Sequence, residues 1–129
     1  MSNATHHSQK LQDILSNFIS HAPDTVFAVV ATAEGLVVGT AYGDAPPVAP
    51  DDTLAATAIR TLELAKTINR ELAQNNGGRI LIEGEKYAVI AGEAGSQMAL
   101  IVAVDANAKL GTAMYGFKRA AAAIAKLYP

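Results

Sequence analysis

Apolar residues recur along the chain with two different periods, one typical of helices and one typical of strands. Residues 8–21 carry apolar side chains at every third or fourth position, as one face of an amphipathic helix does. Pro23 is expected to end this helix. In TVFAVVATAEGLVVGTAYG, residues 25–43, two apolar segments flank Glu34 and Gly35, where glycine suits a tight turn. This part of the chain is therefore predicted to form a helix and an antiparallel β-hairpin.

A second, longer helix is predicted between the prolines of GDAPPVAP, residues 43–50, and the glycines of NNGG, residues 75–78. With Asp51 or Asp52 as its N-cap, it extends to about residue 74 and is about 35 Å long. One apolar arc of this helix is expected to face the core. Its residues are Leu54, Ala58, Leu62, Ala65, Ile68 and Leu72.

Three further strands and a last helix follow. The strands are expected at residues 79–83, 86–91 and 97–104, and the helix from about residue 107. Residues 26–32 and 97–104 are apolar at both alternating sets of positions, as in strands covered on both faces, so they are expected in the middle of the sheet. The strand at 79–83 is expected at an edge. The order α-β-β-α-β-β-β-α predicts an α+β fold, with a five-stranded antiparallel sheet between the first and last helices on one face and the long helix on the other.

One helix cannot cover a whole face of such a sheet. Five strands at a spacing of about 4.8 Å make a sheet roughly 24 Å wide, whereas a helix is about 10 Å across. A second copy of the chain is the economical cover, because two-fold homodimers are the commonest oligomers and an open apolar edge strand invites aggregation. We therefore expect a homodimer.

Composition limits what the protein can be and what it can bind. With 129 residues, the chain can form one domain with its own core, expected at residues 8–129 after a polar lead, residues 1–7, that resembles a disordered tag. The absence of cysteine fits a reducing compartment, and the longest apolar run, residues 99–104, is too short to span a membrane. The formal charge of -2, with ten basic residues spread along the chain, gives no footprint for nucleic acid. We expect a soluble, cytoplasmic protein.

No residue pattern points to catalysis. The segment GRILIEGEK, residues 78–86, does not end in the lysine and serine or threonine of a Walker A loop, so no nucleotide site is expected. His6 and His7 lie in the polar lead and His21 lies at a helix end, which does not gather metal ligands. The four arginines are expected on solvated faces rather than as an arginine finger. We therefore expect no enzymatic activity, no cofactor and no metal ion.

Four local patterns occur together in a fixed order. They are the apolar hairpin around Glu34 and Gly35, the helix start DDTLAATAIRTLELA, the segment ILIEGEKYAVIAGEAGSQMALIVAV and the final VDANAKLGTAMYGFKRAAAAIAKL. Over about residues 8–128, this series resembles the roadblock/LC7 family of dynein light chains and MglB-like proteins. The resemblance implies a homodimer whose third strands pair into one continuous sheet of ten strands. It also implies that the long helices lie side by side as a platform for a small Ras-like GTPase or another complex subunit.

Two interaction surfaces follow from the resemblance and the residue pattern. The dimer interface is expected at Asn69, Arg79, Ile80, Leu81, Ile82 and Glu83. Asn69 is the one polar residue within the apolar arc, either as a satisfied core amide or as one half of a hydrogen-bonded pair between two copies. The partner is expected on the outer face of the paired long helices, where two apolar residues adjoin a mixed-charge stripe. These residues are Ile59, Arg60, Glu63, Leu64, Lys66, Thr67 and Arg70.

The predicted function is that of a non-enzymatic, homodimeric adaptor or regulator. It would bind a small Ras-like GTPase and either modulate its GTP hydrolysis or leave it unchanged. One alternative is a structural, light-chain-type subunit of a larger complex, which would share the fold and the dimer. A small-ligand sensor is a less favoured alternative, because sheet faces filled with valine, isoleucine and alanine argue against a polar ligand pocket.

Overall fold

The structure, a computed structural model, describes residues 3–44, 48–75 and 78–129. Parts of two predicted turns, residues 45–47 and 76–77, lie outside the described residues, as do Met1 and Ser2 of the predicted lead. The elements follow in the predicted order. They are α1 (Asn3–His21), β1 (Thr25–Thr32), β2 (Val37–Tyr42), α2 (Asp51–Glu71), β3 (Arg79–Glu83), β4 (Tyr87–Glu93), β5 (Met98–Asp105) and α3 (Leu110–Leu127).

The five strands form one antiparallel sheet in the order β2-β1-β5-β4-β3. β1 and β5 lie in the middle and β3 lies at an edge, which confirms the prediction from their residue patterns. β2 forms the other edge and contains a β-bulge. Val30 of β1 pairs with Gly39 whereas Ala31 pairs with Val37, so Val38 is an extra residue that makes this edge irregular.

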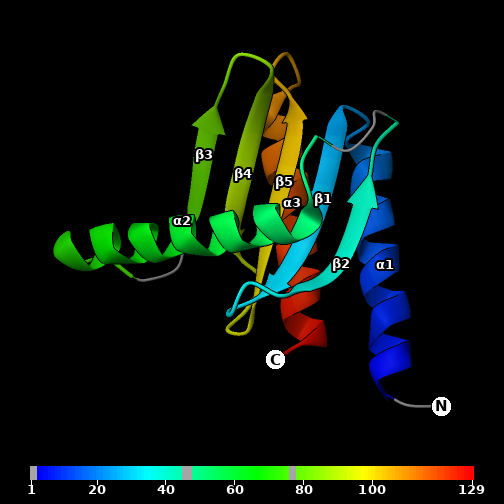
Figure 1. The fold of residues 1–129 in the computed structure, drawn as a ribbon, viewed down its shortest axis with the longest axis horizontal. Coiled ribbons are helices and arrows are strands. Elements are labelled where there is room, and N and C mark those ends of the chain that lie inside the picture. The colour runs from blue at the N-terminus through cyan, green and yellow to red at the C-terminus, as the bar shows by residue number, and fades with distance from the viewer. Residues whose placement is uncertain (1–2, 45–47, 76–77) are drawn as a thin grey trace.

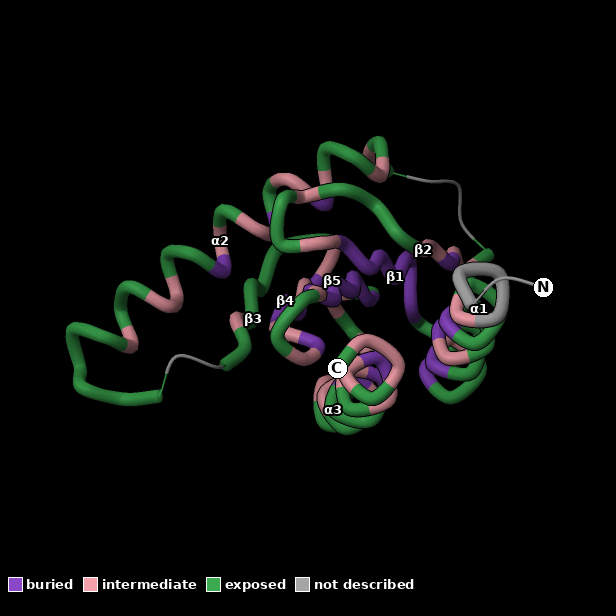
Figure 2. Tube along the Cα trace, turned by 90° about the horizontal axis from the view of Figure 1, so that it is seen from below, coloured by how far each residue is buried: buried purple, intermediate pink, exposed green. Residues whose placement is uncertain are grey.

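Helices cover both faces of the sheet. Figure 1 shows α2 in front of the strands, and Figure 2, seen from below, shows α1 and α3 on the opposite face. The central strands send alternate side chains into the two layers. In β1, Ala28 and Val30 belong to the core under α1 and α3, and Phe27 and Val29 belong to the core under α2. This confirms the predicted α+β arrangement of a sheet between helices.

The two helical layers fill their contacts with the sheet differently. Under α1 and α3 the core contains large buried side chains from both helices. They include Leu11, Leu15, Phe18, Phe117 and Ile124. On the other face, α2 contributes three buried residues, Ala55, Ala58 and Leu62. Because alanine side chains are short, the first half of α2 can pack close to the sheet with little side-chain volume.

Helix α1 begins earlier than predicted. The apolar periodicity places its start near Ser8, whereas helical structure begins at Asn3. The ring of His7 packs edge-on against Tyr128, just beyond α3, with the ring centroids 5.6 Å apart. Residues 3–7 of the predicted lead are therefore helical. The division of the chain at residue 8 stays a prediction.

Both ends of α2 differ from the prediction. Pro50 is the N-cap in place of an aspartate, and Asp51 and Asp52 lie in the first turn, where their charges still favour the helix N-terminus. The helix ends at Glu71, before the glycines of NNGG. Ala73, with a φ of 56°, takes the left-handed conformation that usually falls to glycine. The helix has 21 residues and is about 32 Å long.

Candidate protein-interaction surface

Helix α2 crosses the sheet and continues beyond it. In Figure 1 its first half lies over the strands, and its second half extends past β3. The buried residues of α2, Ala55, Ala58 and Leu62, all lie in the first half. From residue 63 to residue 72, every residue is exposed or half-buried. We call residues 63–72 the α2 overhang, because a single chain buries none of them fully.

A row of apolar side chains follows the α2 overhang. Leu64, Ile68 and Leu72 are spaced four residues apart and therefore share one side of the helix. They are 61%, 47% and 65% exposed, respectively. The prediction that Ile68 and Leu72 face the core is therefore wrong for a single chain. The physical reason is that the sheet ends at β3, so no strand lies beneath the last turns of the helix.

β3 places a second apolar surface at the same end of the molecule. Leu81 and Ile82 are 44% and 48% exposed, and Ile80 is half-buried. Arg79 and Glu83, at the two ends of the strand, are exposed. In the described chain β3 has a hydrogen-bonded neighbour on one side only, β4. The predicted interface residues of this strand therefore form an apolar edge whose outer backbone groups are available for pairing.

Asn69 lies where the α2 overhang meets β3. It is half-buried, and its Oδ1 accepts a hydrogen bond from Nε2 of Gln74 at 3.1 Å. A Cβ atom placed on Gly78, just before β3, would lie 3.4 Å from Asn69 Nδ2. Asn69 therefore occupies the corner between the helix and the edge strand rather than the core. Its contact with a second copy stays a prediction.

Most of the predicted partner surface is exposed on α2. Two arginines of this surface are held by threonines one turn earlier in the helix. Arg60 Nη2 donates to Thr57 Oγ1 at 3.3 Å, and Arg70 Nη2 donates to Thr67 Oγ1 at 3.2 Å. Glu63 is also exposed, and Leu64 is the large apolar residue among these side chains. The outward face of α2 therefore combines an apolar contact point with charges of both signs.

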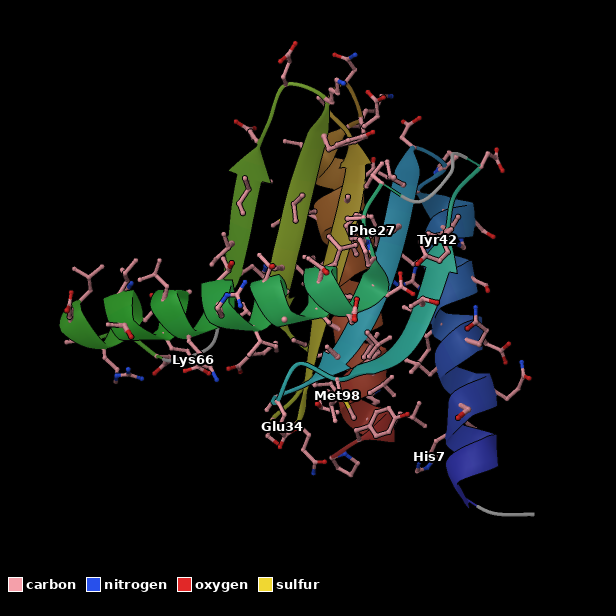
Figure 3. All side chains as sticks on the ribbon, in the orientation of Figure 1. His7, Phe27, Glu34, Tyr42, Lys66 and Met98 are labelled. Carbon is pink, nitrogen blue, oxygen red and sulfur yellow. The ribbon has the colours of Figure 1, made fainter. Side chains whose placement is uncertain are left out.

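Two residues of the predicted partner surface turn inward. Ile59 is half-buried and packs against the core under α2. Lys66, labelled in Figure 3, lies with its Nζ 2.9 Å from Glu93 Oε1 at the end of β4 and 3.9 Å from Glu63 Oε1. The hydrogen bond to Glu93 raises the pKa of Lys66 above its ordinary value of 10.5, although burial opposes this. Lys66 therefore links α2 to the sheet.

The space beside this ion pair does not suit a small ligand. The hollow lined by Lys66, Glu93 and Met98 is about 30 Å³, room for about one water molecule, whereas ligand sites typically measure roughly 300–1,000 Å³. Among the described residues, no group of three or more histidine or acidic side chains is placed to hold a metal ion. In the same ranges, no helix combines the length and apolar character needed to cross a membrane.

Solved structures show the same fold. Gliding protein MglB from Thermus thermophilus matches with a TM-score of 0.87 and 22% identity, over 94% of this chain and 90% of that chain. MglB from Myxococcus xanthus gives 0.83 at 16% identity, over 94% and 89%. A Roadblock/LC7 domain from Streptomyces avermitilis gives 0.73 at 21% identity, over 85% and 90%. At these identities the likeness is one of fold.

The sequence match is to a family rather than to an individual protein. No curated protein sequence matches the chain. The family model of the Roadblock/LC7 domain matches residues 11–104, from α1 into β5. This range contains three of the four patterns on which the sequence resemblance depends, and the last pattern, which begins at residue 104, lies almost entirely beyond it. The chain therefore belongs to the Roadblock/LC7 domain family.

Proposed function

We propose that the protein is a non-enzymatic, homodimeric adaptor that works in the cytoplasm and binds a small Ras-like GTPase. The observation that carries this proposal is the apolar edge formed by β3 and the α2 overhang, which one chain leaves uncovered. Native proteins rarely leave such an edge open, because it is a template for pairing with other chains. The GTPase is supported by the roadblock/LC7 family resemblance, which implies a platform for Ras-like GTPases.

A two-fold arrangement of two copies would cover this edge in one step. The β3 strands of the two copies would run antiparallel and extend the sheet from five to ten strands. Each α2 overhang would then reach across the boundary and lie beside the α2 helix of the other copy. The exposed Ile68 and Leu72 would be buried between them, together with Ile82, which pairs with Val89 and so lies on the α2 face of the sheet. Leu81 pairs with Ile90, lies on the opposite face and would be covered by the paired strand.

The outward face of α2 would stay accessible in this dimer. Arg60, Glu63, Thr67 and Arg70 are exposed on α2, and the exposed Leu64 is the large apolar residue among them. A few apolar anchors within a charged rim are typical of transient protein interfaces. Such charges act mainly on encounter rate and specificity. We place the GTPase contact at these residues, with Ile59 and Lys66 supporting the helix from below.

The dimer can be tested with two matched leucines. Leu72 and Leu36 are 65% and 66% exposed, but Leu72 lies on the α2 overhang and Leu36 lies just before β2, at the opposite edge of the sheet. The Leu72→Asp variant is expected to weaken the dimer about a hundredfold, because a charge would be buried in the interface. Leu36→Asp should leave it unchanged. Light scattering at micromolar concentration measures both. A wild-type monomer, or a Leu72→Asp variant as dimeric as the wild type, would contradict the dimer.

GTPase binding can be tested with the small Ras-like GTPases encoded in the same genome, each loaded with GDP or a GTP analogue. Joint Arg60→Glu and Arg70→Glu substitutions should weaken capture about tenfold or more while leaving the dimer and its melting temperature nearly unchanged. Turnover rates with and without the protein report any change in hydrolysis. A stable dimer that captures none of these GTPases would overturn the adaptor proposal and favour the structural, light-chain-type subunit.

A further inference from the structure

The helical face opposite α2 is positively charged, although the protein as a whole is acidic. Helices α1 and α3, with the N-cap residue of α3, contain five of the ten basic residues and one of the twelve acidic residues. The basic residues are Lys10, Lys109, Lys118, Arg119 and Lys126, and the acidic residue is Asp13. The fold therefore brings Lys10, from the start of the chain, to the same face as the four basic residues between residues 109 and 126.

A groove runs between α1 and α3 on this face. It consists of two hollows, of about 120 Å³ and about 350 Å³, and both are lined by Ile14 and Ala123, so they are continuous. Between Gly116 and Leu127 the groove follows about three turns of α3, a length of about 16 Å. Apart from its charged residues and from Asn17 and His21, the lining is apolar or small and forms what we call the floor: Ile14, Phe18, Gly116, Ala120, Ala123 and Leu127.

Unpaired cations line the rim of this groove. Arg119 borders the smaller hollow, Lys10 and Lys126 border the larger one, and Asp13 is the one carboxylate in either lining. Within the described residues, none of the three cations forms an ion pair; the two ion pairs of the structure belong to Lys66. The Arg119 guanidinium carbon lies 5.8 Å from the centre of the Tyr115 ring, which favours an extended side chain along α3.

We infer that the groove between α1 and α3 binds an acidic, amphipathic helix of a partner protein. An apolar floor about three turns long matches a helix that presents apolar side chains at every third or fourth position. The cationic rim is complementary to carboxylates that flank those apolar side chains. The two helices that line the groove, α1 and α3, lie on the face of the sheet opposite α2 (Figure 2), so an occupant of the groove and a partner on α2 can bind the same molecule at once. The inference does not depend on the proposed GTPase.

A protein helix suits this face better than a lipid bilayer does. Membrane-binding helices project large apolar side chains that insert into the lipid. In the described parts of α1 and α3, Tyr115 is the one large apolar side chain that is strongly exposed. The large apolar side chains that line the groove, Ile14, Phe18 and Leu127, are buried or half-buried. A bilayer could reach the cations but not this floor.

The test uses two stapled helical peptides of about three turns. Both have leucines at every third or fourth position. The residues beside the leucines are glutamates in one peptide and lysines in the other. Fluorescence anisotropy with the full chain should show saturable binding of the glutamate peptide and at least about tenfold weaker binding of the lysine peptide. Joint Arg119→Glu and Lys126→Glu substitutions should weaken the glutamate peptide about tenfold or more. Lys118→Glu is the matched control, because Lys118 is exposed on α3 but lines neither hollow.

Three results would overturn the inference. One is equal affinity for the two peptides, or no saturable binding of the glutamate peptide. Another is full affinity in the Arg119→Glu and Lys126→Glu protein when circular dichroism shows that it is folded, or a loss in Lys118→Glu as large as in that double variant. The third combines two observations: the protein does not bind the glutamate peptide, but it sediments with vesicles of equal parts phosphatidylserine and phosphatidylcholine. This result would assign the face to a membrane.

Discussion

Helices α1 and α3 cover their face of the sheet with large side chains, whereas α2 covers the other face mainly with small ones. Leu15 and Phe117 are almost completely buried under the first layer. Under α2, the buried helix residues are Ala55, Ala58 and Leu62, and the larger Leu64, Ile68 and Leu72 are exposed. This contrast indicates that the α1 and α3 layer supplies much of the stability of one chain, whereas the large apolar side chains of α2 are exposed and available for the proposed dimer and partner.

The largest effect that distinguishes the two layers is expected from Phe117→Ala. Phe117 is 1% exposed, and removing a buried ring of this size typically costs about 3–5 kcal/mol. Urea unfolding should show this loss at every protein concentration. Leu72→Ala is the comparison, because Leu72 is 65% exposed in one chain and should affect stability only through the dimer. If both variants lost the same free energy of unfolding, and this loss did not depend on protein concentration, the contrast between the two layers would be wrong.

A smaller effect is expected from the ion pair that links α2 to β4. Lys66→Met should destabilise the protein by about 0.5 kcal/mol near neutral pH, because the pair with Glu93 is partly exposed and screened. The raised pKa of Lys66 means that this contribution is complete below 10.5, its ordinary value, and is lost as the pH rises through the higher value of the folded state.

Urea unfolding of the wild type and Lys66→Met, at neutral pH and again well above pH 10.5, checks this prediction. The difference between the two proteins should shrink at the higher pH. Arg70→Met is the control, because Arg70 contacts Thr67 rather than a carboxylate and an arginine stays charged at both pH values. A difference that is the same at both pH values would mean that Lys66 stabilises α2 by packing alone.

An effect of similar size, but of opposite sign, is expected at the end of α2. Ala73 has a φ of 56°, a conformation that costs a residue with a Cβ about 1–2 kcal/mol. Glycine adopts this conformation without strain, but it also gives the unfolded chain more freedom, which offsets part of the stability gained by the substitution. Ala73→Gly should therefore stabilise the protein by about 0.5 kcal/mol in thermal unfolding. Ala65→Gly, within the helix, should instead destabilise it by about 1 kcal/mol. Destabilisation by both would show that Ala73 is not strained.

The residue pattern was sufficient to predict the elements, the layers and the edge position of β3. Residues 26–32 and 97–104 read as central strands because both of their faces are apolar, and β1 and β5 do lie in the middle. The pattern could not show what covers Ile68 and Leu72, because an apolar helix residue looks the same whether its contact comes from its own sheet or from another molecule. Where α2 leaves the sheet depends on sheet width and crossing direction, which are properties of the whole fold.

The candidate site was predictable to a similar extent. The exposure of Arg60, Glu63 and Arg70 followed from helical periodicity. The inward position of Lys66 did not, because its partner Glu93 lies on another element and only the packing of α2 against β4 brings the two side chains together. The groove between α1 and α3 was missed for the same reason. Arg119 and Lys126 lie on α3, whereas Lys10 lies on α1 near the other end of the chain, so the three border one groove only after both helices pack on the sheet.

The bulge at Val38 bears on how large an assembly this chain can form. A sheet with two equal, flat edges could add copies at both ends without limit and grow into a filament. Here β2 is irregular at Val38, and a Cβ on its Gly39 would lie 2.8 Å from a methyl group of Leu11, so α1 packs tightly against this strand. In the proposed dimer, the regular β3 edges of the two copies would pair with each other, and the irregular β2 edges would lie at the two ends of the sheet. Growth of the sheet would then stop at two chains, even at high concentration.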